Sequence, residues 1–243
     1  MVLHPQELTI WYHFKLSPKI LIRTRRGCDI DKYPHAKNYL EKNKKEVESR
    51  YAVRKEGLKW FEIVRYNADI FSENIKEQIY AYYRSTYNKF AYSNKRFVTL
   101  TTTFVLTKKE GLEISLKYLV GILNSSLIQD YTKRNAKKMG NCYEYSSNFI
   151  GSIPIKIASE EEQRRVIELV DKMMVAVKRL QELKNKTTDE KARLEKEIKK
   201  LDEEIDQEVY KLYGLTDEEI KIVEGSLKWV KKIRNVSDSL KKI

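Results

Sequence analysis

The side chains that most often carry catalysis or hold metal ions are few and scattered in this chain. Its three histidines are His4, His13 and His35, and its two cysteines are Cys28 and Cys142. No C-x-x-C or H-E-x-x-H arrangement is present to surround a zinc ion. No G-x-G-x-x-G or P-loop segment is present to cradle a nucleotide phosphate. We therefore expect no catalytic residue, metal site or cofactor in this chain, and no enzyme activity of its own.

Phosphate binding is the chemistry that the sequence does favour. The net charge of +13 is uneven, because residues 1–155 contain 27 Lys and Arg against 15 Asp and Glu, whereas residues 156–243 contain 21 against 20. The first part also contains most of the aromatic residues. Clustered cations neutralise phosphates, so this block favours binding to a polyanion. The alternative is that the same cations form an ordinary solvated surface.

The candidate contact residues divide into two groups. Bases are read by Arg or Lys at guanine, by Asn at adenine and by apolar groups at thymine. We expect such base-reading side chains in a hairpin before residue 98 and in a basic loop at 133–148. In the hairpin they are Arg84, Lys89, Lys95 and Arg96, and in the loop they are Lys133, Arg134, Lys137, Lys138, Asn141 and Tyr143. We expect residues that position phosphates on or just after a helix at 36–51, namely Lys44, Lys45, Arg54 and Lys55.

Short strands and helices must position these residues. Runs of β-branched and aromatic residues predict strands at 9–24, 60–64, 75–83 and 99–107, and a turn at Ser93-Asn94 predicts a hairpin that joins 90–92 to 96–98. Apolar periodicity predicts helices at 36–51 and 116–131. We therefore expect an α+β fold, in which a mixed α/β domain spans residues 1–157.

Residues 158–243 are predicted to form a long antiparallel helical hairpin followed by short helices. Capping boxes start at Ser159, Thr187 and Thr216, and Gly214 is placed to end a helix. Apolar seams with coiled-coil-like spacing follow the first two boxes, at Val166, Val170, Met173, Val177 and Leu180, and at Leu194, Ile198, Leu201, Ile205, Val209 and Leu212. Each arm is about 35–40 Å long at 1.5 Å per residue.

Several segments, taken in order, resemble the TaqI-like C-terminal specificity domain. This domain is the target-recognition part of type IIG restriction-modification enzymes and related N6-adenine DNA methyltransferases. The most similar segment is 116–127, L-K-Y-L-V-G-I-L-N-S-S-L, which resembles the pattern L-x-Y-L-L-x-I-L-N-S-x-L that type I specificity subunits share. Weaker similarities lie at Tyr33-Pro34 with Leu40, at Trp60-Phe61-Glu62, at 76–98, at Ile153-Pro154-Ile155 and at 201–220.

The resemblance implies that residues 1–157 recognise a double-stranded DNA target. It also implies a separate methyltransferase or nuclease domain or subunit as partner, with S-adenosylmethionine bound in the methyltransferase. In type I specificity subunits, helices of this kind set the geometry between subunits, which allows self-association through the hairpin here. We expect Asn124 and Ser125, within the most similar segment, to bond to the backbone rather than to a base.

Two other function classes stay open at this point. One is a protein-interaction scaffold in which the hairpin docks partners and the basic block is non-specific, and the other is an RNA-binding module that stacks single-stranded bases on aromatic side chains. No apolar run is long enough to span a membrane, and the N-terminus has no apolar signal core. Two cysteines far apart in the sequence are typical of a reducing compartment, so we expect a cytoplasmic protein without a membrane partner.

Overall fold

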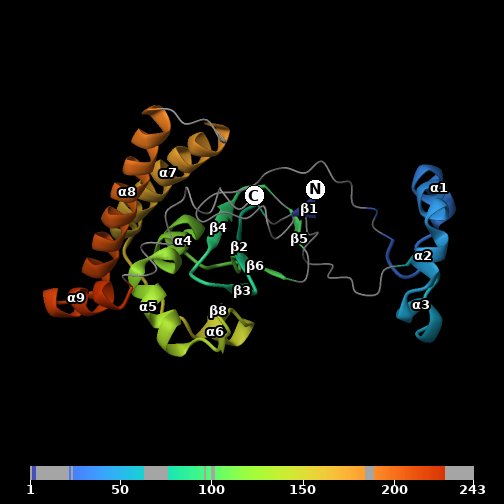
Figure 1. Cartoon of the computed structure of the whole chain (residues 1–243), viewed down its shortest axis with the longest axis horizontal. Coiled ribbons are helices and arrows are strands. Elements are labelled where there is room, and N and C mark those ends of the chain that lie inside the picture. The colour runs from blue at the N-terminus through green and yellow to red at the C-terminus, as the bar shows by residue number, and fades with distance from the viewer. Residues whose placement is uncertain are drawn as a thin grey trace. The chain divides into compact units, whose positions relative to one another are not determined.

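The computed structural model describes residues 2–3, 22, 24–62, 76–95, 97–99, 102–183 and 189–227 (Figure 1). The chain divides into two compact units, of which the first comprises Met1 and residues 18–74 and the second comprises residues 2–17 and 75–243. Helices and small sheets both occur, which confirms the predicted α+β class. Nearly all of the strand predicted at 9–24 lies outside the described residues.

The first unit contains short helices. They are η2 (Ile30–Lys32), α1 (Pro34–Lys42), α2 (Lys44–Glu48) and α3 (Tyr51–Lys55). The single helix predicted at 36–51 is therefore wrong. The α-helical backbone is interrupted at Asn43 (φ −110°, ψ 18°) and at Arg50 (φ −59°, ψ 139°).

The side chain of Arg50 accounts for the break between α2 and α3 and for the turn that replaces the strand predicted at 60–64. Its guanidinium donates to the carbonyl oxygens of Trp60 at 2.7 Å and Glu62 at 3.0 Å. Trp60 and Phe61 form a turn rather than the predicted start of a strand, and residues 63–64 lie outside the described part. We expect both aromatic residues in the core from their type, and Phe61 is buried whereas Trp60 is half-buried.

The second unit is organised around an antiparallel sheet in the order β4-β2-β6. Its strands are β4 (Phe90–Ser93), β2 (Gln78–Tyr82) and β6 (Thr103–Thr107), with Ile79 of β2 opposite Tyr92 and Leu106. Alternate side chains of β2 are buried on opposite faces, because Ile79 joins the main core whereas Tyr80 joins a smaller cluster. Strand β2 confirms the strand predicted at 75–83, and β6 confirms the second half of the strand predicted at 99–107, since Thr102 lies in a turn and residues 100–101 lie outside the described part.

The predicted hairpin between 90–92 and 96–98 is wrong. Strand β5 (Val98–Thr99) pairs in parallel with β1 (Val2–Leu3), whereas β4 pairs with β2. The chain leaves β4 because Phe97 turns into the smaller core cluster, where its backbone N–H donates to the Tyr80 hydroxyl at 2.9 Å. Burial of this ring therefore overrides the local turn signal.

The predicted basic loop at 133–148 is mostly regular structure. It contains the end of α5 (Ser126–Asn135), then β7 (Lys138–Met139) and β8 (Cys142–Glu144), and it runs into α6 (Ser147–Ser152). Strands β7 and β8 form a hairpin with Gly140 and Asn141 as its two-residue turn, and Gly140 has φ +61°. Strand β3 (Arg84–Ser85) completes a second sheet in the order β3-β8-β7.

The helix predicted at 116–131 is interrupted at Ser125. Helix α4 (Leu116–Asn124) ends there, and α5 begins with Ser125 in an extended conformation (φ −63°, ψ 158°). The Ser125 hydroxyl accepts the Ile128 N–H at 3.3 Å, as an N-cap does. The expected backbone role of Ser125 is confirmed.

The long helices follow the prediction closely. They are α7 (Glu160–Leu183) and α8 (Asp189–Tyr213), which lie side by side in Figure 1, and α9 (Asp217–Ser226) follows them. All five residues of the first seam are buried, and the second seam is buried or half-buried. The capping boxes at Ser159 and Thr216 are present, Gly214 ends α8 with φ +68°, and Thr187 lies outside the described residues.

The second unit has one main hydrophobic core to which the sheet and the long helices both contribute. It includes Ile79, Phe90, Ile122, Val166 and Ile205, from β2, β4, α4, α7 and α8. The expected boundary at 157 therefore does not separate two cores, and the division into domains 1–157 and 158–243 stays a prediction. None of the helices in the described ranges is both long and apolar enough to cross a membrane.

Candidate nucleic-acid interface

The β3–β8–β7 sheet brings together candidate residues that lie about 50 positions apart in the sequence. Arg84 on β3 is opposite Glu144 on β8, and Lys138 on β7 is opposite Tyr143. The side chains of Arg84 and Lys138 are exposed, as is Asn141 at the tip of the β7–β8 hairpin. This sheet therefore presents cations and an amide from two separate predicted segments within one small area.

Glu144 lies among these cations, and sequence reasoning did not single it out. The Tyr83 hydroxyl donates to Glu144 Oε1 at 2.5 Å, and Lys137 Nζ lies 3.7 Å from Oε2. The hydrogen bond from Tyr83, with the charges of Lys137 and Arg84, lowers the pKa of Glu144 and keeps it ionised. The available signal was that Glu144 is the one acidic residue in the segment 133–148.

Lys89 and Lys95 have different surroundings. Lys89 is half-buried, with its Nζ 4.6 Å from the centre of the Tyr87 ring and 5.9 Å from that of Tyr82. Such cation–π contacts hold the ammonium group in place. Lys95 is exposed in the turn after β4, where its backbone N–H donates to Ser93 Oγ. Arg96 lies outside the described residues.

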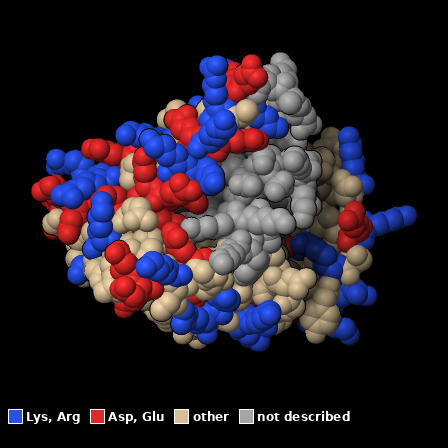
Figure 2. Space-filling view, turned by 60° about the vertical axis from the view of Figure 1, so that its left-hand side comes forward, with Lys and Arg blue, Asp and Glu red and all other residues tan. Residues whose placement is uncertain are grey.

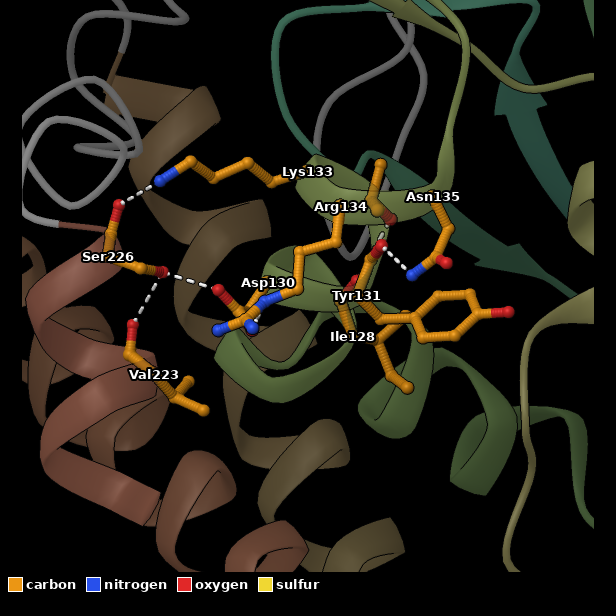
Figure 3. Close-up of polar contacts among 9 residues, drawn as sticks. Ile128, Asp130, Tyr131, Lys133, Arg134, Asn135, Val223 and Ser226 are labelled. Atoms are coloured by element: carbon orange, nitrogen blue, oxygen red, sulfur yellow. Dashed lines mark hydrogen bonds and ion pairs between the residues drawn. The ribbon is translucent and has the colours of Figure 1, made fainter. Parts of the chain in front are cut away.

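Lys133 and Asp130 of helix α5 both bond to Ser226 of helix α9, and Arg134 pairs with Asp130 (Figure 3). Arg134 Nε donates to Asp130 Oδ2 at 2.7 Å, while Asp130 Oδ1 accepts the Ser226 hydroxyl at 2.6 Å. Lys133 Nζ donates to the Ser226 carbonyl oxygen at 3.0 Å, at the end of α9 where a cation also stabilises the helix dipole. Both cations thus have a structural role that the sequence did not predict.

Tyr143 is placed in the core rather than on the surface. Only 7% of the residue is exposed, and burial raises the pKa of its hydroxyl. Tyr145, two positions further along the chain, is also buried, and its hydroxyl donates to Asn88 Oδ1 at 2.8 Å. The expectation that Tyr143 contacts DNA is not supported by this position, because a side chain so buried does not reach a base.

The four predicted phosphate-positioning residues lie in the first unit, which is described here by itself. Lys44 pairs with Glu48 at 3.4 Å and lies 5.3 Å from the centre of the Trp60 ring. Lys45 is exposed on α2, and Arg54 and Lys55 are exposed in the last turn of α3. Cations at the end of a helix also stabilise its dipole, so α3 benefits from them without any ligand.

The most family-like segment, 116–127, has a structural role. The fully buried Asn124 side chain donates to the Phe90 carbonyl oxygen at 2.8 Å and accepts the Phe90 N–H at 3.0 Å, so it pairs with β4 as a neighbouring strand would. The next residue but one, Ser126, donates its N–H and hydroxyl to Asp206 of α8 at 2.7 and 2.5 Å. The expected backbone role of Asn124 is confirmed.

The long helices have a mixed surface charge. Figure 2 shows Lys and Arg side chains interspersed with Asp and Glu over these helices, and several of these side chains form ion pairs within one helix, such as Arg165 with Glu161 and Lys200 with Glu204. Over the described ranges, no group of three or more His, Cys, Asp or Glu side chains is arranged to hold a metal ion.

Comparison with known proteins gives two results. The family described as the TaqI-like C-terminal specificity domain matches residues 23–155, which is more than half of the chain. A solved structure of the type IIL restriction-modification enzyme MmeI in complex with DNA has a similar fold, with a TM-score of 0.52 and 14% sequence identity. That similarity covers 86% of this chain but 28% of the MmeI chain. The match over 23–155 establishes that this chain belongs to the TaqI-like C-terminal specificity domain family.

Proposed function

We propose that this chain is the sequence-specific double-stranded DNA recognition module of a restriction-modification enzyme. The observation that carries the proposal is its membership of a specificity-domain family over residues 23–155, the part that holds nearly all of the net positive charge. The fold it shares with part of MmeI, a restriction-modification enzyme solved with DNA, supports the same function.

The shape of the β7–β8 hairpin supports a contact with the duplex. The major groove of B-DNA accommodates a two-stranded β-ribbon, and base edges are read there by Arg, Lys and Asn side chains. The hairpin has Asn141 at its tip and Lys138 beside it, while Arg84 extends the cationic surface from the neighbouring strand. We therefore place base reading at this sheet, and phosphate contacts at the exposed cations around it.

Catalysis, in this proposal, belongs to a partner domain or subunit. A methyltransferase that binds S-adenosylmethionine, or a nuclease, would act on the site that this chain selects, as in type IIG enzymes. The chain spans 28% of the MmeI chain, and the rest of such an enzyme would supply the chemistry.

The hairpin of α7 and α8 would act as a coiled-coil-like spacer and as a surface for self-association. Neither Cys28 nor Cys142 forms a disulfide, which fits a reducing, cytoplasmic location.

The direct test measures binding of the full chain to duplex DNA, single-stranded DNA and RNA of matched sequence while salt is raised. We expect the duplex to bind best and its affinity to fall steeply with salt, because phosphate contacts release counterions. A preference for single strands would favour the RNA-binding alternative, and no binding at about 150 mM salt would favour the scaffold.

Two lysine variants provide a matched comparison for this test. Lys138→Ala removes an exposed cation from the β3–β8–β7 sheet, and Lys199→Ala removes one from α8, where its side chain is 74% exposed. We expect only Lys138→Ala to weaken duplex binding and to reduce the salt slope by about one unit. Equal effects of the two variants would contradict a specific interface at this sheet.

A further inference from the structure

The β3–β8–β7 sheet contains one acidic residue among its cations. The residues of its three strands are Arg84 and Ser85, Lys138 and Met139, and Cys142, Tyr143 and Glu144. A carboxylate beside a duplex is repelled by the phosphates, so it weakens non-specific binding. A carboxylate at a DNA-reading surface gains affinity only where a hydrogen-bond donor of the DNA faces it.

Glu144 is held in one position by groups from two other segments. Its Oε1 accepts the Tyr83 hydroxyl, while Oε2 lies 3.7 Å from Lys137 Nζ, a distance too long for a hydrogen bond. The Glu144 N–H donates to the Lys137 carbonyl oxygen at 2.9 Å, and the Tyr145 N–H donates to the Tyr83 carbonyl oxygen at 2.9 Å. The backbone on both sides of the carboxylate is therefore fixed.

The carboxylate retains capacity to accept further hydrogen bonds. An ionised carboxylate has about four acceptor positions, of which the Tyr83 hydroxyl uses one. Its side chain is 15% exposed, and the exposed guanidinium of Arg84 lies on the strand opposite. An acceptor that is ionised, fixed and partly exposed can discriminate between ligands that offer a donor and ligands that offer an acceptor.

We propose that Glu144 is a specificity-determining residue that accepts a hydrogen bond from an exocyclic amino group of a target base in the major groove. This inference rests on the proposed function. Cytosine N4 and adenine N6 are the amino donors in that groove, whereas guanine and thymine present acceptors that a carboxylate repels. Tyr83 is a positioning residue, because it acts on the base only through the orientation of the Glu144 carboxylate.

The test selects binding sequences from a randomised duplex pool with the full chain at about 150 mM salt. It compares the wild type with Glu144→Gln, with Tyr83→Phe, and with the control Glu203→Gln, which removes an exposed carboxylate from α8. Glutamine keeps an oxygen for Tyr83 but adds donors, so it accepts bases that the carboxylate rejects.

We expect the wild-type motif to contain one base pair restricted by Glu144, and the base of that pair that carries the amino group, cytosine or adenine, identifies the donor. Glu144→Gln should lower the preference at that position by on the order of tenfold and leave the other positions unchanged. Tyr83→Phe should lower it at the same position by a smaller factor. Glu203→Gln should give the wild-type motif.

Two results of the selection would overturn the inference and are distinguishable from each other. If Glu144→Gln selects the same motif as the wild type at every position, Glu144 does not determine specificity, but the proposed function stands. If the wild type enriches no motif, both the inference and the proposed function are wrong. If Glu144→Gln does not fold, the wild type is tested on duplexes whose restricted base lacks its amino group, and unchanged affinity for them would also overturn the inference.

Discussion

The contact between helices α4 and α7 yields a prediction about stability. A Cβ atom built on Gly121 of α4 lies 2.5 Å from Val166 Cγ1 and 3.2 Å from Val170 Cγ2. Real Cβ atoms essentially never approach another carbon to 2.5 Å, so Gly121→Ala forces the two helices apart or moves a valine. Both valines are fully buried on α7 and belong to the core that joins the sheet to the long helices.

The expected magnitude comes from two opposing effects. Alanine is favoured over glycine inside a helix by about 1 kcal/mol. Overpacking a close-packed core costs about 1–3 kcal/mol, and a helical valine has one strongly preferred rotamer, so Val166 cannot turn its methyl group away cheaply. A contact of 2.5 Å against a side chain held in this way places the overpacking cost in the upper part of that range, about 2–3 kcal/mol. After the helix preference of alanine is subtracted, we expect Gly121→Ala to lower the free energy of unfolding by about 1–2 kcal/mol.

Urea unfolding followed by circular dichroism measures this change, and Gly225→Ala provides the matched control. Gly225 lies in α9, and a Cβ built there meets no atom within 4 Å beyond its chain neighbours and the backbone of its own helix. Alanine there should leave stability unchanged or raise it by up to about 1 kcal/mol. The double variant Gly121→Ala/Val166→Ala should be more stable than the sum of the two single effects predicts. A Gly121→Ala protein as stable as the wild type would refute this account of the α4–α7 contact.

Three further predictions follow from single polar contacts. Asp206→Ala should cost about 3 kcal/mol of stability in urea unfolding, because it leaves the buried Ser126 N–H and hydroxyl without their acceptor. A loss below about 0.5 kcal/mol would argue against the importance of these two hydrogen bonds. Hydrogen bonds from Ser159 lower the pKa of Glu162 below its usual 4.5, so the carboxylate stabilises the fold above that pH and loses this effect as the pH falls through the lowered pKa. Ser159→Ala should raise the pKa of Glu162 in an NMR titration. An unchanged pKa would contradict the contribution of the Ser159 hydroxyl. Lys133→Ala should speed amide hydrogen exchange in α9, whereas unaltered exchange would show that its bond to Ser226 does not hold the helix.

The helical part of the fold was predictable because its signals are local. The seam residues, the capping boxes at Ser159 and Thr216 and the C-terminal Gly214 each act within one or two turns of helix, and the structure confirms them. The helix at 116–131 was predicted as one element because its apolar periodicity continues past Ser125. The helix is interrupted next to Asn124, whose side chain pairs with the backbone of Phe90, 34 residues away.

The strands and the candidate site were harder to predict, because their partners are distant in sequence. Strand β3 pairs with β8, which lies about 60 residues later. A two-residue strand is too short for its local sequence pattern to predict that pairing. Candidate cations could be found by type, but their bonding could not. Lys133 bonds to the end of α9, Arg134 pairs with Asp130, and Tyr143 is buried. The hydroxyl that holds Glu144 belongs to Tyr83, which lies 61 positions earlier in the sequence.

The specificity ratio for duplex DNA tests the central claim most directly. It compares the Kd of the full chain for a duplex selected from a random pool with its Kd for a shuffled duplex of the same composition, at about 150 mM salt. A sequence-reading module should favour the selected site by on the order of 10³ or more, because base contacts survive at a salt concentration that weakens phosphate contacts. Equal Kd values for the two duplexes would contradict the claim that this chain recognises a DNA sequence.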